Sequence, residues 1–125
     1  MIGYVTLGTN DLEKAAAFYD ELLGLIGGQR FMEMDRAVAW RASDDSPGIS
    51  VGKPYDGNAA TVGNGTMIAL MTQSPEQVQA LHAKALELGG SDEGAPGERI
   101  PGFYGAYFRD LDGNKLCAFC MKAAE

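Results

Sequence analysis

Histidine, cysteine and basic residues are all scarce in this sequence. Its 125 residues include one His and two Cys, and 10 Lys and Arg stand against 17 Asp and Glu, which gives a formal net charge of −7. Binding to nucleic-acid phosphates or to an anionic membrane surface needs an excess of basic residues that releases counterions. We therefore expect neither nucleic acid nor a membrane as partner.

Long hydrophobic runs are absent too. No apolar stretch approaches the roughly 20 residues that a helix needs to span a bilayer. The segment from Met1 to Val5 reads directly as a strand, without the basic start and apolar centre of a signal peptide. Cys117 and Cys120 lie in one expected strand, where their side chains point to opposite faces and cannot bridge each other. We predict a cytoplasmic protein with reduced thiols.

What the sequence does contain is typical of a globular domain. Hydrophobic residues make up 46% and charged residues 22% of the chain. The length suits a single domain over residues 1–125, with a core that needs neither disulfides nor metals. Seventeen glycines predict frequent turns and short strands.

The first half reads as one strand, one helix and three further strands. Residues 4–8 alternate their side chains as a strand does. Asp11 begins a helix whose apolar side chains recur at the spacing of one buried stripe, and Gly24 ends that helix. The three strands that follow are expected at 29–34, 37–41 and 49–53.

The second half repeats this order. A strand at 66–71 precedes a helix with Ser74 as its cap, a proline at the first helical position and Gln77 closing a capping box. An offset of 63 residues places Asp11 on Ser74, and it places Gly27, just beyond the first helix, on Gly90, which stops the second. Two of the later strands are expected around 103–109 and at 115–121.

The repeat predicts an α+β fold made of two βαβββ modules. Module 1 covers about 1–57, a linker rich in Gly and Asn covers about 58–64, and module 2 covers about 65–125. One module alone leaves a sheet face uncovered. We therefore expect the modules to pack together, with the helices outside and the other sheet face lining a shared cleft.

A hairpin near the end of the chain has the clearest local signature. The sequence YFRDLDGNKLCAF at 107–119 reads as a strand, a tight turn and a strand. Gly113 and Asn114 tolerate positive φ at the turn, and an aspartate can bond to its own backbone. The alternative, a calcium loop, fails because the glycine comes fourth and the twelfth residue is Met121.

With these features in order, the chain resembles the vicinal oxygen chelate superfamily, which includes glyoxalase I, bleomycin-resistance proteins and extradiol dioxygenases. The resemblance rests on the paired modules, on Asn10 to Glu13 after the first strand, on Phe18-Tyr19, and on residues 108–114. It implies two βαβββ modules in a cupped, mixed and mostly antiparallel sheet with helices on the convex side. It also implies a homodimer.

The same resemblance bears on metal binding. At the positions where metal-using members have two His and a Glu, this chain has Tyr4, Met67 and Cys117. None is a His or a carboxylate, the ligands that hard or borderline divalent ions prefer. We therefore expect no cofactor. A divalent metal held by relocated ligands, with Glu33 as a carboxylate to consider, is the alternative.

Aromatic and sulfur side chains on strands suggest a small-molecule site. Such side chains can stack on or enclose a flat or apolar ligand, and they can equally close the core. Trp40 stands out because a buried indole needs a partner for its N–H. Arg109 could hold an anionic group or pair with a nearby acid. The predicted ligand-binding residues are Tyr4, Thr6, Trp40, Met67, Tyr104, Tyr107, Arg109 and Phe119.

Two functions follow from these patterns. The first is a glyoxalase/bleomycin-resistance-like protein that binds a small, partly apolar or aromatic molecule in the sheet cleft without the usual metal site. The alternative is a lyase, isomerase or dioxygenase of the same superfamily, with Tyr4 or Cys117 as the catalytic residue. Cys117 can also simply fill space. His82, the only histidine, is interpreted as a partly exposed helix residue rather than a general base.

Overall fold

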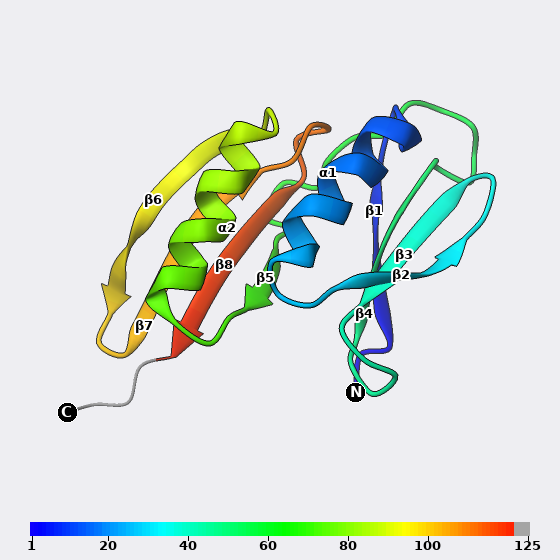
Figure 1. The fold of residues 1–125 in the computed structure, drawn as a ribbon. Helices are drawn as coiled ribbons and strands as arrows, with labels where there is room; N and C mark the ends of the chain where they lie inside the picture. The colour runs from blue at the N-terminus through cyan, green and yellow to red at the C-terminus, as the bar shows by residue number, and fades with distance from the viewer. Residues whose placement is uncertain (122–125) are drawn as a thin grey trace.

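The computed structural model describes residues 1–121 and shows two similar halves (Figure 1). Each half has the order strand, helix and three strands, which confirms the prediction of an α+β fold with two βαβββ modules. The first half contains β1 (Tyr4–Gly8), α1 (Leu12–Gly24), β2 (Gln29–Glu33), β3 (Ala37–Arg41) and β4 (Gly48–Gly52). The second contains β5 (Ile68–Met71), α2 (Pro75–Glu87), β6 (Ser91–Ile100), β7 (Phe103–Arg109) and β8 (Lys115–Met121).

The strands form two four-stranded mixed sheets with the same topology. Their orders are β1-β4-β3-β2 and β5-β8-β7-β6. The first strand of each half pairs in parallel with the last, and the other pairs are antiparallel. Each module contributes one of these sheets, and β1 and β5 do not pair with each other within the chain.

Both helices begin at the predicted caps. The Asp11 carboxylate accepts a hydrogen bond from the Lys14 backbone N–H at 3.2 Å. The Ser74 hydroxyl accepts one from the Gln77 N–H at 3.2 Å. The Gln77 side chain reaches back one residue beyond the expected position, to the N–H of Gln73 at 2.9 Å. These bonds satisfy backbone donors that a helix start leaves unpaired.

One continuous core joins the two halves. The buried side of α1 packs on the first sheet, the buried side of α2 packs on the second, and the helices also touch each other. In Figure 1 both helices lie in front of the strands. Among the described residues, neither helix is long and apolar enough to cross a membrane.

The hairpin turn between β7 and β8 ties the second module to the first. The Asp110 carboxylate is buried and accepts hydrogen bonds from the N–H groups of Asp112 and Asn114, both at 2.9 Å. It also accepts one from the Tyr19 hydroxyl of α1 at 2.6 Å. The Asn114 amide donates to Asp110 and to the carbonyl of Gly8 in β1, at 2.9 and 3.0 Å. The predicted turn is therefore also a junction between modules.

Candidate functional site

The helices cover one face of each sheet and leave the other face open. Side chains alternate along a strand, so burial identifies the two faces. In β1, Leu7 lies under the helix layer, and Tyr4 and Thr6 point the other way. In β8, Leu116, Ala118 and Cys120 lie in the core, and the alternate residues point away. We call the uncovered surfaces the N-terminal open face and the C-terminal open face.

The N-terminal open face carries two aromatic rings beside a shallow pocket. Tyr4 is 67% exposed and Phe31 is 41% exposed. The Arg41 guanidinium lies 4.3 Å from the centre of the Phe31 ring. A side chain at Gly48 would come within 3.1 Å of that ring, so glycine allows Phe31 to lie flat on β4. All three side chains, with the ends of β1 and β4, line a pocket of about 360 Å³.

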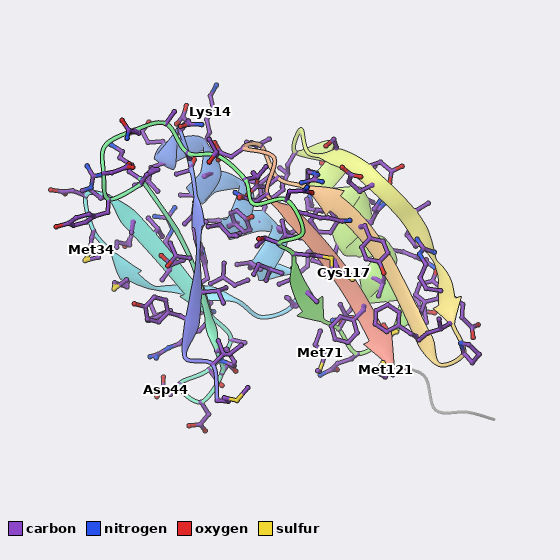
Figure 2. All side chains as sticks on the ribbon, turned by 180° about the vertical axis from the view of Figure 1, so that it is seen from behind. Lys14, Met34, Asp44, Met71, Cys117 and Met121 are labelled. Atoms are coloured by element: carbon purple, nitrogen blue, oxygen red, sulfur yellow. The ribbon has the colours of Figure 1, made fainter. Side chains whose placement is uncertain are left out.

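The C-terminal open face is richer in aromatic and sulfur side chains. Phe103 and Phe119 stack with their ring centres 5.3 Å apart. Tyr107 pairs with Cys117 across β7 and β8, so both side chains lie on this face. Met67 is 41% and Met71 is 73% exposed. Figure 2 shows the molecule from behind, with Met71, Cys117 and Met121 labelled on the strands of the second sheet.

Cys117 lies on this face but is covered by its neighbours. The residue is fully buried, and burial raises the pKa of its thiol above the ordinary value. A hydrogen bond to Tyr107 and the charge of Arg99 act in the opposite direction and are smaller. Because a thiolate is the nucleophile, a raised pKa and a covered sulfur both reduce reactivity. The surroundings of Cys117 favour a packing role in the sheet over a nucleophilic one.

Trp40 is not part of either open face. It is 1% exposed and lies under α1, where its indole N–H donates to the Asp20 carboxylate at 2.8 Å. Its ring centre is 5.7 Å from that of Tyr19. Arg30 also binds Asp20 and holds the pKa of this carboxyl below its usual range. The indole N–H of Trp40, for which a partner was expected, is therefore hydrogen-bonded within the protein.

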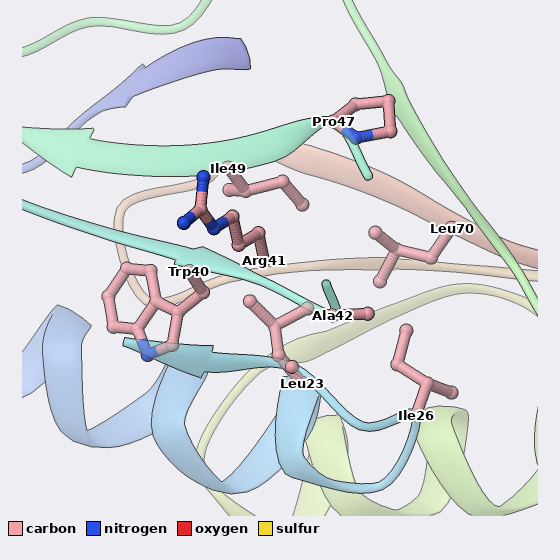
Figure 3. A pocket seen from close by; sticks show the side chains of 9 residues that line it. Leu23, Ile26, Trp40, Arg41, Ala42, Pro47, Ile49 and Leu70 are labelled. Atoms are coloured by element: carbon pink, nitrogen blue, oxygen red, sulfur yellow. The ribbon is translucent and has the colours of Figure 1, made fainter. Parts of the chain in front are cut away.

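Trp40 does border a small cavity on the helix side (Figure 3). This cavity has a volume of about 110 Å³ and lies where the end of α1 meets β3, β4 and the side chain of Leu70 from β5. Its lining is mainly apolar, with Leu23, Ile26 and Ile49 around it. It is small for a ligand site and is best understood as a packing gap between the two modules.

Tyr104 is also on the helix side. It pairs with Cys120 and packs against the core, and its hydroxyl accepts a hydrogen bond from the Gln79 amide of α2 at 3.0 Å. The expected position at a cleft is not observed, because β7 places Tyr104 on the same side as Phe108. The other predicted ligand-binding residues lie on the open faces: Tyr4 and Thr6 on the first, and Met67, Tyr107, Arg109 and Phe119 on the second.

Within one chain, β1 is not in contact with β5 or β8. No Cα atom of β1 lies within 8 Å of a Cα atom of β5 or β8. Tyr4 is consequently separated from Cys117, although the resemblance places them in one site. The single chain therefore carries Tyr4 and Cys117 on strands that are not neighbours.

The metal site implied by the resemblance does not fit these residues. A phenol, a thioether and a covered thiol with a raised pKa are poor donors for a hard or borderline divalent ion. Tyr4 is also remote from Cys117. Within residues 1–121, no three or more His, Cys, Asp or Glu side chains are grouped as a metal would require. Glu33 pairs with Arg30 at 2.5 Å on the helix side.

Sequence reasoning missed two contributors to the open faces. Phe31 lies at the register shift between Arg30 and Met32 in β2, so simple alternation could not assign its face. Arg99 belongs to β6, for which no specific strand was predicted; its guanidinium lies 5.4 Å from the centre of the Tyr107 ring. The sequence of β6 has no alternating pattern that would predict a strand, because Gly94, Pro96 and Gly97 interrupt it.

Comparisons with known proteins identify the family to which this chain is similar. Residues 1–118 match the family model described as the glyoxalase/bleomycin resistance protein/dioxygenase superfamily. A glyoxalase/bleomycin resistance protein from Albidiferax ferrireducens is 39% identical, with a TM-score of 0.89 over 96% of this chain and 98% of that chain. A hypothetical protein from S. aureus is 27% identical, with a TM-score of 0.75 over 96% and 92% of the two chains.

A more distant structure shares the fold alone. Lactoylglutathione lyase from Agrobacterium tumefaciens is 18% identical, with a TM-score of 0.73 over 96% of this chain and 92% of that chain. Among curated proteins, none matches the sequence.

Proposed function

Because the chain belongs to the glyoxalase/bleomycin resistance protein/dioxygenase superfamily, we propose that it binds a small, partly apolar or aromatic molecule on its open sheet faces. The observation that carries this proposal is the exposure of aromatic and sulfur side chains on strands that the helices leave uncovered. Isolated exposed apolar residues are ordinary, but a set gathered on an uncovered sheet face indicates a binding surface.

In this proposal the protein is a cytoplasmic homodimer, and it binds its ligand without the superfamily's usual metal site. Each chain contributes one half-cleft from each module, so a partner chain would supply the face that a single chain keeps apart. The exposed rings of the N-terminal open face would then lie opposite the methionines and aromatic residues of the partner's C-terminal open face. Tyr4, Met67 and Cys117 would line this cleft rather than coordinate an ion.

Enzymatic use of Cys117 as a nucleophile has less support than ligand binding. Its sulfur is covered, and the raised pKa keeps it as a thiol at neutral pH. The proposed function therefore requires no thiolate at Cys117. A lyase, isomerase or dioxygenase activity would need residues beyond those that the resemblance supplies.

Binding can be tested with N-phenyl-1-naphthylamine, a neutral aromatic dye whose fluorescence rises in apolar sites. We expect saturable binding to the full chain, and about three- to tenfold weaker binding by Tyr4→Ser, because one aromatic contact contributes about 0.5–1.5 kcal/mol. The matched control is Tyr55→Ser, which removes a fully exposed tyrosine from the loop after β4, outside both open faces. Absence of saturable binding, or equal weakening by both substitutions, would exclude the proposed site.

A further inference from the structure

A second pocket lies at the end of the C-terminal open face, beside the linker between the modules. Its volume is about 440 Å³. Residues 62–66 and Met67 line one side, and Arg109 and Lys115 line the other. No Asp or Glu lines it, although acidic residues outnumber basic ones by 17 to 10 in the chain. The pocket is therefore electropositive in an acidic protein.

Lys115 forms no salt bridge within the part of the chain that the structure describes. It is paired with Arg109 across β8 and β7, so both side chains leave the sheet on the same face. Its ammonium lies 5.5 Å from the centre of the Tyr107 ring. Within residues 1–121, no carboxylate oxygen comes within 4.0 Å of that ammonium. The charge is thus free to bind an anion.

Arg109 is held in place by two hydrogen bonds. Its Nε donates to Glu93 at 2.7 Å, and one terminal nitrogen donates to the carbonyl of Gly113 at 2.9 Å. Arg109 thus pairs with Glu93 of β6 and not with Asp110, Asp112 or Glu98. The second terminal nitrogen has no partner among the described residues. A guanidinium fixed in this way loses little conformational freedom when it binds an oxyanion.

The surrounding charge favours an anion even though Glu93 offsets part of it. Arg109 holds the pKa of Glu93 below its usual range, so this carboxylate stays ionised beside the guanidinium. Arg99 adds a third cation on the other flank of Tyr107. Arg99, Arg109 and Lys115, from β6, β7 and β8, therefore lie on this face. Glu93 pairs directly with one of them, Arg109.

Building on the proposed function, we propose that this pocket binds the anionic group of the ligand. The group is a carboxylate or a phosphate, held between Arg109 and Lys115, and the apolar part of the same molecule extends over Tyr107 and Phe119. The proximity of the cations to an aromatic surface defines the class: an aromatic or apolar carboxylic acid or phosphate monoester. Charge-assisted hydrogen bonds supply the preference for the charged group over a neutral one.

The test is a titration of the ¹⁵N-labelled full chain with benzoate, phenyl phosphate, inorganic phosphate and neutral benzamide at fixed ionic strength. Benzoate or phenyl phosphate should shift the amide signals of residues 62–67, Arg109 and Lys115, and should bind at least tenfold more tightly than benzamide. Lys115→Met should weaken the better anion about tenfold. Lys84→Met, on α2 and paired with Glu87, is the charge-matched control and should change nothing.

Each other outcome has a defined meaning. If benzoate and benzamide bind equally, the anion pocket is wrong while the proposed aromatic site stands. If neither shifts residues of the open faces, both proposals fail. Equal weakening by Lys115→Met and Lys84→Met would assign the effect to net charge and overturn the pocket.

Preference for phenyl phosphate over benzoate identifies phosphate as the group, and the reverse identifies carboxylate. Inorganic phosphate that binds as tightly as phenyl phosphate would remove the aromatic part of the inference.

Discussion

Tyr19 is fully buried, and its hydroxyl donates to a carboxylate that is also buried. Burial and the negative charge of Asp110 raise the pKa of Tyr19 well above its ordinary value. Both groups come from sequence motifs that identify the family, yet neither lies on an open face. Their chemistry therefore serves the junction of the modules and not the binding of a ligand.

The substitution Tyr19→Phe should lower the free energy of unfolding by about 1.5–3 kcal/mol at pH 7, because a hydrogen bond to a charged group is lost. Below pH ~10 both folded and unfolded protein keep the Tyr19 proton. Above it, the unfolded state releases this proton first, so the contribution of Tyr19 falls as pH rises. The difference between native protein and variant should shrink between pH 9 and 11 in urea unfolding experiments.

The control for this experiment is Tyr55→Phe, which removes a hydroxyl from an exposed tyrosine. It should leave the free energy of unfolding unchanged within about 0.5 kcal/mol. A difference between Tyr19→Phe and the native protein that does not depend on pH would contradict the role assigned to the raised pKa.

At the scale of the element, the hairpin of β7 and β8 depends on the backbone of its turn. Gly113 has φ +91°, a conformation that side-chain-bearing residues rarely adopt. A Cβ atom there would meet only Val62 at 3.6 Å, which is ordinary contact. Backbone strain is therefore the main cost of any substitution at this position.

We expect Gly113→Ala to lower the free energy of unfolding by about 1–2 kcal/mol, measured as a lower urea midpoint. Gly24→Ala makes the same chemical change inside α1, where φ is not positive and nothing lies within 4 Å of the added methyl group. It should raise stability by about 0.4–1 kcal/mol. Effects of equal sign in the two variants would show that the turn is not strained as described.

The elements themselves were largely predictable. Both helices combine a capping side chain, a buried stripe and terminal glycines, and these local signals agree with one another. β6 gave no such signal, because Gly94, Pro96 and Gly97 break the alternation and the strand shifts register against β7. Its assignment depends on pairing with a distant segment, which local patterns do not specify.

The facing of side chains was harder to predict. Alternation in β8 correctly placed Cys117 and Phe119 on one face, because the charged Lys115 marks that face as exposed. In β3, Arg41 marks the exposed face in the same way, so alternation places Trp40 on the opposite face. In β7, Arg109 shares its face with Tyr107, and Tyr104, three residues from Tyr107, lies on the other face. The expectation that Trp40 and Tyr104 line a cleft failed because aromatic character does not determine which face of a strand a side chain occupies.

At the scale of the whole molecule, the two sheets leave apolar surface without cover. Met71, Tyr4 and Phe31 are all substantially exposed, although they share faces with buried residues. Stable association of two copies would remove such surface from water and bring complementary half-clefts together. Each copy would provide both halves, so a two-fold arrangement would satisfy both clefts at once.

We expect sedimentation velocity to give twice the 13.3 kDa mass of one chain at micromolar concentration. Met71→Lys should shift the distribution toward monomer, because a charge at the open face opposes its burial. Met34→Lys makes the same change at an exposed methionine of the turn between β2 and β3, and should leave the dimer intact. A native monomer at 100 μM would contradict the proposed dimer.

The buried hydrogen bond from Tyr19 to Asp110 also bears on how the two repeated modules are related. The offset of 63 residues makes Tyr19 the counterpart of His82, but His82 bonds to Asp92 of its own module at 2.9 Å. The turn between β3 and β4 bonds within itself, with the Ser43 hydroxyl 2.8 Å from that of Ser46. The copies have thus become complementary rather than interchangeable. A tandem of two first modules would carry two tyrosines but would lack the Asp110 turn that receives the Tyr19 hydroxyl, so one half could not replace the other without losing this hydrogen bond.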